Sequence, residues 1–213
     1  MAAERLTPIL HHTELDLSST FSKMTDGKIY LKCENRQKTG SFKIRGASNK
    51  LAAMASRGER TPVVASSAGN HAQGVAYAAS RFGIQATIVM PKAAPIAKIQ
   101  ATEGYGAKVV LHGDCYDDAY DHAVEICSRE GATFLHPYND PDVIAGQGTL
   151  GLEILADLPY VDVIADVGAN VLTVKHDKLN PSLKPNETIV RIDCEVGGKS
   201  HGDALIRRLT QQG

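Results

Sequence analysis

The sequence predicts an α/β fold in which helices flank a parallel sheet. Short apolar runs alternate with longer segments of helical periodicity between residues 62 and 157. Strands that alternate with helices of this length are typical of βαβ units, and the strands of such units are parallel. After residue 160 the alternation ends, and the remaining residues predict a short α+β tail.

The region before this alternation predicts one strand and one helix. Residues 28–34 alternate between apolar and polar side chains, which indicates a strand. Residues 35–40 are polar and predict a turn. Ser41 is a candidate N-cap for the next helix, because its hydroxyl can accept a bond from an unpaired helix amide. Gly58 stands where that helix is expected to end.

The alternating region and the tail divide into individual elements. The predicted strands are 62–66, 85–90, 107–112 and 133–136, and the predicted helices are 71–82, 94–103, 115–130 and 141–157. The helix over 115–130 carries an acidic face. In the tail, strands over 170–176 and 187–196 enclose a turn rich in Pro and Asn, and a helix over 200–211 follows.

Composition argues against several classes of protein. The 23 basic and 24 acidic residues give a net charge of −1, without the basic excess of a nucleic-acid-binding protein. No apolar run has the length of a membrane span, and the opening residues lack the apolar core of a secretory signal. We therefore expect a cytoplasmic protein. The four cysteines and eight histidines lack disulfide or metal-ligand spacing, so no metal site is predicted.

Lys43 is the first candidate for chemistry. If Ser41 caps the helix, Lys43 lies in its first turn, where the helix dipole disfavours an ammonium group. Lys38 and Arg45 lie close in sequence and add like charge, which also favours the neutral amine. A neutral amine is what Schiff-base formation with an aldehyde requires. The alternative is a solvated helical lysine without a role.

A second candidate lies between a predicted strand and a predicted helix. Ser66, Ser67, Ala68, Gly69, Asn70 and His71 follow one another there. Small residues allow a ligand to approach the backbone, and amides at a helix N-terminus bind anions. A carboxylate or a phosphate would fit this turn. The alternative is an ordinary turn that uses small residues.

Four segments together indicate a family. They are LKCENRQKTGSFKIRGA at 31–47, SSAGNHAQGVAYAA at 66–79, VMPKAAPIAKIQATEGYGAKVVLHG at 89–113 and PYNDPDVIAGQGTLGLEI at 137–154. In order and spacing they resemble the threonine/serine dehydratases (threonine ammonia-lyases), which depend on pyridoxal phosphate (PLP) and have the tryptophan-synthase-β-like fold. The resemblance covers roughly residues 5–163. It implies a dehydratase-like region over 1–163, with a small subdomain over 50–140.

The resemblance implies roles for the candidate residues. Lys43 would bond the cofactor and then take the α-proton of the substrate. Phe42 would pack against the pyridine ring, and Asn70 would bond the ring hydroxyl oxygen. Amides and side chains of Ser67, Ala68, Gly69, Asn70 and His71 would hold the substrate carboxylate. Threonine or serine would lose its β-hydroxyl and give a 2-oxo acid and ammonia.

Two departures from the family keep alternatives open. Serine racemases of this group carry a serine where this chain has Ala68, and alanine cannot donate a proton, so dehydration is favoured over racemisation. The glycine-rich phosphate loop does not follow residue 163, as though an internal stretch were missing near 162–166. Residues 164–213 resemble part of an ACT-like regulatory domain. A non-catalytic form that binds or regulates full-length subunits is therefore the alternative function. A homo-oligomer and an allosteric amino acid or nucleotide are further expectations.

Overall fold

The computed structural model describes residues 2–25, 27–158, 170–177, 189–195 and 207. The chain divides into two compact units, Met1–Asp157 and Leu158–Gly213. Each unit is described by itself below.

A four-stranded parallel sheet forms the centre of the first unit. Its strands are β3 (Val63–Ser66), β4 (Ala86–Met90), β5 (Lys108–Leu111) and β6 (Thr133–Phe134). They stand in the order β5-β4-β3-β6, and every neighbouring pair is parallel. All four residues of β3 are buried, as expected for an inner strand of a covered sheet. The predicted parallel sheet is therefore confirmed.

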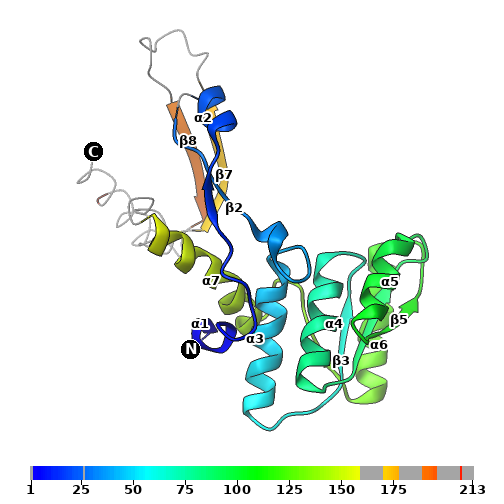
Figure 1. Ribbon diagram of the computed structural model, residues 1–213. Coiled ribbons are helices and arrows are strands. Elements are labelled where there is room, and N and C mark those ends of the chain that lie inside the picture. The colour runs from blue at the N-terminus through cyan, green and yellow to red at the C-terminus, as the bar shows by residue number, and fades with distance from the viewer. Residues whose placement is uncertain (1, 26, 159–169, 178–188, 196–206, 208–213) are drawn as a thin grey trace. The chain divides into compact units, whose positions relative to one another are not determined.

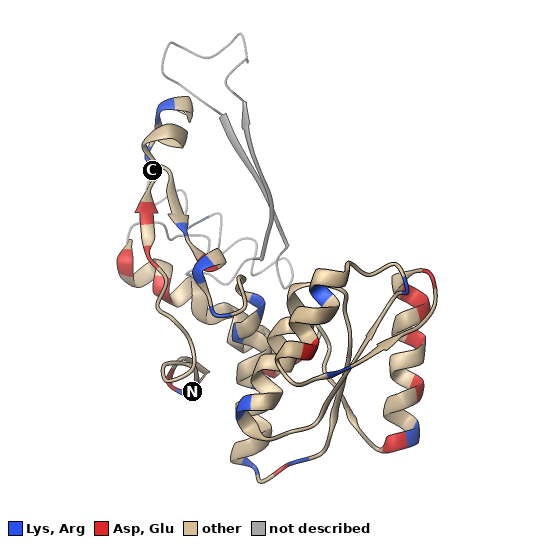
Figure 2. Ribbon diagram, turned by 45° about the vertical axis from the view of Figure 1, so that its right-hand side comes forward, with Lys and Arg blue, Asp and Glu red and all other residues tan. Residues whose placement is uncertain are grey.

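Helices cover both faces of this sheet. They are α3 (Lys43–Ser56), α4 (Asn70–Phe82), α5 (Ile96–Gly104), α6 (Tyr116–Glu130) and α7 (Pro141–Asp157), and Figure 1 shows α3 beside α4. Val63 and Ala65 pack in one apolar cluster with residues of α3 and α4, whereas Val64 packs with residues of α6. This division follows from the alternation of side chains along a strand. The acidic residues of α6 are exposed, in agreement with the predicted acidic face, and Figure 2 shows their positions along the ribbon in red.

The start of α3 differs from the prediction. Phe42, and not Ser41, is the N-cap residue, and no side chain caps the helix. The backbone of Phe42 is already in the right-handed helical region, with φ −64° and ψ −16°, so the extended geometry of a side-chain cap is absent. Ser41 still accepts a hydrogen bond from the Lys43 amide at 3.3 Å. At the other end, Gly58 adopts a φ of 77°, in agreement with its predicted role.

The N-terminal region contains short elements that the sequence did not indicate. These are α1 (Ala2–Leu6), β1 (Leu15–Leu17), α2 (Ser19–Thr25) and the 3-10 turn η1 (Glu34–Arg36). β1 pairs in antiparallel fashion with β2 (Tyr30–Lys32), which is the central part of the strand predicted over 28–34. Each element is seven residues or shorter, and a segment of that length carries too few residues to show a period.

The second unit contains one antiparallel strand pair among its described residues. β7 (Asn170–Asp177) pairs with β8 (Ile189–Glu195), and both match predicted strands. The turn between them, the segment over 165–169 and most of the helix predicted over 200–211 lie outside the described residues. In the part of the chain that is described, no helix is both long and apolar enough to cross a membrane.

α3 and α7 approach each other closely at two glycines, Gly46 of α3 and Gly146 of α7. A Cβ added to Gly146 would lie 2.6 Å from the Arg45 carbonyl oxygen and 2.7 Å from the Gly46 Cα. Both atoms belong to the backbone, so the helices would have to move apart. We expect Gly146→Ala to lower the free energy of unfolding by about 1–3 kcal/mol, measured by urea denaturation.

Gly151, on the same helix, provides the control for this prediction. A Cβ at Gly151 would meet no atom within 4 Å. Because alanine favours helix over glycine by about 1 kcal/mol, Gly151→Ala should be neutral or stabilising. If both variants lost the same stability, the close approach of the helices would not be the cause.

Candidate active site

Lys43 lies at the N-terminus of α3, and its amine is held by a distant segment. The Nζ donates a hydrogen bond to the Pro137 carbonyl oxygen at 2.9 Å. It lies 5.6 Å from the centroid of the Phe42 ring, which is itself exposed to solvent. The sequence therefore placed Lys43 correctly in the first helical turn, beside an aromatic face that a ligand can reach.

The pKa of the Lys43 amine is lower than that of an ordinary lysine, and the cause is burial. The like charge of Arg45 was also expected to lower this pKa. That part is wrong, because Arg45 is neutralised by two carboxylates, Glu34 and Glu153, at 2.7 Å each. Burial disfavours the charged form of an amine, so the neutral, nucleophilic form becomes more accessible.

The turn after β3 presents small residues to open space. Gly69 donates a backbone hydrogen bond to the Ser67 hydroxyl at 3.2 Å, and α4 begins at Asn70. A Cβ added to Gly69 would meet no atom within 4 Å outside its chain neighbours, so the turn is open at this position. The first amides of a helix have no acceptor within the helix, which suits them to bind an anion.

Lys43 and this turn lie close together because of the topology. β3 and β6 are parallel neighbours, so the Ser67–Asn70 turn and Pro137 follow strands that end at the same edge of the sheet. On the other side, Gly74 of α4 packs against the start of α3, since a Cβ there would lie 3.2 Å from the Lys43 carbonyl group. Residues far apart in sequence thus meet at one edge, as expected for ligand sites of open α/β sheets.

Asn70 and His71 differ in accessibility. The Asn70 side chain is exposed, and its Oδ1 accepts a hydrogen bond from Lys98 at 3.4 Å. The His71 ring is buried, and its Nε2 lies 3.1 Å from the Leu135 carbonyl oxygen. Because a carbonyl only accepts, Nε2 carries the hydrogen. The side chain of His71 is therefore engaged with the protein interior.

Burial lowers the pKa of His71 from 6.5 to about 4, although its bond to Leu135 acts in the opposite direction. Unfolded chains bind a proton at this histidine between pH 6.5 and 4, whereas the folded chain does not. Above pH 6.5, His71 therefore does not reduce the free energy of unfolding. As the pH is lowered from 6.5 to 4, its protonation in the unfolded chain lowers the free energy of unfolding by about 3 kcal/mol. Urea denaturation of the full chain at several pH values tests this expectation. His71→Gln should remove this part of the pH dependence, and an unchanged dependence would contradict it.

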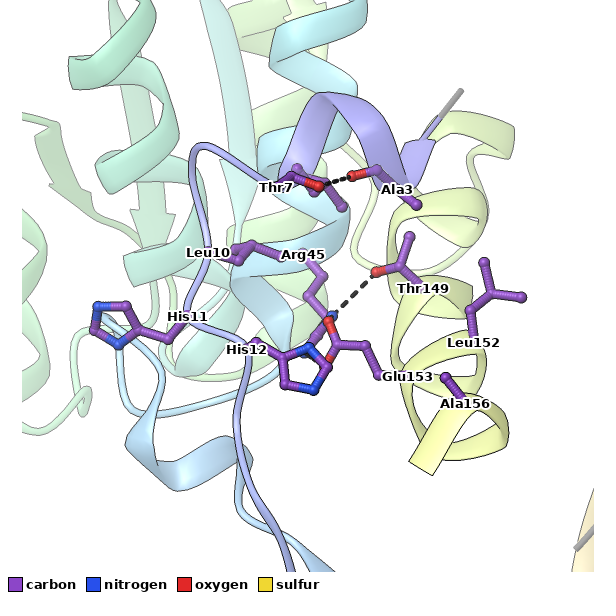
Figure 3. Close-up of a pocket in the computed structure, with 11 residues that line it drawn as sticks. Ala3, Thr7, Leu10, His11, His12, Arg45, Thr149, Leu152, Glu153 and Ala156 are labelled. Carbon is purple, nitrogen blue, oxygen red and sulfur yellow. Dashed lines mark hydrogen bonds and ion pairs between the residues drawn. The ribbon is translucent and has the colours of Figure 1, made fainter. Parts of the chain in front are cut away.

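A separate cavity lies on the other face of α3. It has a volume of about 270 Å3. Its walls come from α1, the segment after it, α3 and α7 (Figure 3). Neither Lys43 nor any residue of the Ser67–His71 segment lines it. Lys43 and Arg45 are two positions apart on a helix, so their side chains point in nearly opposite directions. The cavity is therefore distinct from the site at the sheet edge.

Arg45 forms a buried ion cluster beside this cavity. Its side chain is fully buried and makes two hydrogen bonds with Glu34, two with Glu153 and one with Thr149, the last seen in Figure 3. Lys32 adds a second cation, 2.7 Å from Glu153. Burial alone would raise the pKa of both glutamates, but the hydrogen bonds and charge of Arg45, together with Thr13 and Gln37 at Glu34 and Lys32 at Glu153, hold both pKa values below the ordinary value. The cluster joins η1, α3 and α7.

Comparison with known proteins identifies the family. Residues 4–182 match the family described as pyridoxal-phosphate dependent enzyme. This chain belongs to that family of PLP-dependent enzymes. The match runs beyond residue 163, where the resemblance in the sequence was judged to end. Among the described side chains, no group of three or more His, Cys, Asp or Glu is placed to hold a metal ion.

The proteins that resemble this PLP-dependent chain carry the names of several related enzymes. It is 53% identical over 195 residues to an L-threonine ammonia-lyase of Thermotoga maritima. That alignment covers 91% of this chain and 49% of the relative, so the chain spans about half the length of this curated relative. Its fold resembles threonine deaminase isoform 2 of Solanum lycopersicum (TM-score 0.68, 39% identity, 72% of this chain and 42% of that one). It also resembles maize serine racemase (TM-score 0.71, 37% identity, 76% and 49%).

Proposed function

We propose that this chain is a PLP-dependent ammonia-lyase that acts on threonine or serine. The observation that carries the proposal is the Lys43 amine, which has a lowered pKa and lies at the sheet edge where the Ser67–Asn70 turn opens. The name of the Thermotoga maritima relative, L-threonine ammonia-lyase, supports the same reaction. Loss of the β-hydroxyl and hydrolysis would yield a 2-oxo acid and ammonia.

The residues at this edge fit the cofactor. Lys43 would bond its aldehyde carbon, since burial favours the neutral form of the amine and its hydrogen bond goes to an uncharged carbonyl oxygen. The exposed Phe42 ring would lie against the pyridine ring, and the exposed Asn70 amide would bond the ring oxygen. When bound, PLP withdraws electrons from the substrate Cα. Once the substrate amine has displaced it from the cofactor, Lys43 would receive the α-proton at Nζ, and the Pro137 carbonyl would hold that atom in place.

The substrate carboxylate would be held by the Ser67–His71 segment. Ser67, Ala68 and Gly69 are half-buried around the open space, and Asn70 and His71 supply first-turn amides of α4. His71 would contribute its amide, because its ring is turned toward Leu135. Ala68 offers no proton, so elimination is favoured over racemisation at this site.

The proposed function is tested by adding PLP to the purified 213-residue chain. We expect visible absorption of a lysine-bound cofactor, a label on Lys43 after borohydride reduction and peptide mapping, and ammonia release from threonine or serine. A colourless chain with unmodified Lys43 would overturn the assignment. Label on Lys43 without ammonia release would instead favour the non-catalytic alternative.

That alternative, a binding or regulatory partner of longer subunits, has one observation in its favour. Large apolar side chains are exposed along β1, α2 and β2, at Leu17, Phe21, Met24 and Leu31. Exposed apolar patches are typical of interaction surfaces. In this organisation residues 1–163 form the dehydratase-like region and residues 164–213 a regulatory segment that takes an amino acid or nucleotide. Light scattering on the purified chain tests the homo-oligomer that we expect.

A further inference from the structure

The segment after β6 holds two polar side chains that come from different helices. The Leu135 carbonyl oxygen accepts from the His71 Nε2 at 3.1 Å, and the Pro137 carbonyl oxygen accepts from the Lys43 Nζ at 2.9 Å. Residues 135–137, here named the 135–137 segment, thus join α4 to α3. Its first residue is also fixed to the sheet, because the Leu135 amide donates to the Val64 carbonyl at 2.8 Å.

His71 is built into this arrangement more firmly than Lys43. Its ring is 3% exposed, whereas the Lys43 side chain is only half-buried. The second ring nitrogen, Nδ1, is buried and has no hydrogen-bond partner among the described residues. Leaving a buried polar atom without a partner costs free energy, so the bond of Nε2 to Leu135 is the contact that offsets the burial of this ring.

The charged and titratable groups that act on His71 are Lys43 and His136, and both lower its pKa. A protonated His71 would place a second positive charge beside the Lys43 amine. The ring is instead neutral at neutral pH, and it acts as a hydrogen-bond donor to the backbone without adding charge. This is the form of histidine that can orient a segment without repelling a nearby amine.

We propose that His71 is a positioning residue: its bond to Leu135 fixes the 135–137 segment, so that the Pro137 carbonyl holds the Lys43 amine in place at the sheet edge. The inference rests on the proposed function in one respect, the role of Lys43 as the residue that bonds the cofactor. It assigns the His71 side chain a task different from the binding of the substrate carboxylate.

The test measures the Lys43 amine directly in the full-length chain. Competitive acetylation with trace acetic anhydride, followed by peptide mapping across a pH series, gives the pH at which each lysine becomes reactive. Lys92, an exposed lysine, serves as the internal standard. In the unmodified chain Lys43 should react at a lower pH than a lysine of ordinary pKa 10.5.

Three substitutions separate positioning from a general loss of structure. In His71→Leu the released 135–137 segment should let water reach the Lys43 amine, so the burial that lowers its pKa is reduced. The pH profile of Lys43 should then move up toward the ordinary value, and labelling at pH 8 should drop several-fold relative to Lys92. His71→Gln should restore the profile, because its amide nitrogen reaches about as far as Nε2. His71→Asn, with the same amide on a shorter side chain, should behave like His71→Leu and replaces it if the leucine variant does not fold.

An unchanged Lys43 profile in folded His71→Leu or His71→Asn would overturn the proposal, as would equal profiles for the asparagine and glutamine variants. Acetylation of the chain without PLP reports on the free Lys43 amine and does not depend on cofactor binding. A chain that shows the expected profiles but takes up no PLP would therefore contradict the proposed function and leave the positioning role intact.

Discussion

Replacing Lys43 with alanine should abolish both the borohydride-stable attachment of PLP and the release of ammonia from threonine. The variant loses the amine whose Nζ lies 2.9 Å from the Pro137 carbonyl oxygen at the sheet edge. Neither Phe42 nor Asn70 has a side chain that can bond an aldehyde carbon. The measurement combines the visible spectrum, peptide mapping after reduction and an ammonia assay.

Lys92→Ala provides the matched control, because Lys92 is an exposed lysine after β4. It should keep both attachment and turnover. Ammonia release that survives in Lys43→Ala would mean that another residue carries the cofactor. Loss of both activities in Lys92→Ala would show that the assay reports on surface lysines in general.

Arg45→Met should produce the largest loss of stability of any substitution considered for this chain. Arg45 is fully buried and holds Glu34 and Glu153. Removing one partner of a buried ion pair typically costs about 3–5 kcal/mol, because the remaining charge is left without compensation. Glu34 would keep its bond from Thr13, and Glu153 its contact with Lys32. The free energy of unfolding is measured by urea denaturation.

Arg57→Met is the control for this second prediction. Arg57 lies at the end of the same helix and pairs with Glu59 at 2.7 Å, but both side chains are exposed. Water screens such a pair, so its removal should change the urea midpoint little. If the two variants unfolded at the same urea concentration, the buried cluster would not be a main support of the fold.

The ion cluster also adds a second pH dependence to that of His71. The pKa values of Glu34 and Glu153 are lowered in the folded chain. Their contribution to the free energy of unfolding is therefore present above pH 4.5, the ordinary carboxyl pKa, and is lost as the pH falls below that value. It lies at lower pH than the loss assigned to His71, so the two can be measured separately.

Much of the fold could be predicted because its elements are long and periodic. The apolar run over 62–66 corresponded to β3, and the helix predicted between Ser41 and Gly58 corresponded to α3. Among the N-terminal elements, β2 was predicted as part of the strand over 28–34. The others, α1, β1, α2 and η1, could not be found, because none is longer than seven residues. The N-cap was misassigned because Ser41 has the right chemistry, but the backbone already turns at Phe42.

Only part of the candidate site could be predicted from the sequence. Lys43 and the Ser67–Asn70 turn could be found because their chemistry lies in consecutive residues. The pairing of Arg45 with Glu153 could not be predicted, because Glu153 is 108 positions away and no local sequence feature marks it. The bond between His71 and Leu135 spans 64 positions and uses a backbone carbonyl, which every residue possesses. Such contacts depend on which strands become neighbours, here β3 and β6.

Lys43 lies two residues before Arg45, so the proposed cofactor residue and the buried ion cluster share one turn of α3. A ligand that binds only the folded chain raises the free energy of unfolding by mass action, by about 2.7 kcal/mol at one hundred times its dissociation constant. That gain is similar in size to the loss expected from breaking the Arg45 cluster on the opposite face of the same helical turn. PLP would then act as a folding ligand, and a chain short of cofactor would spend more time open to proteases.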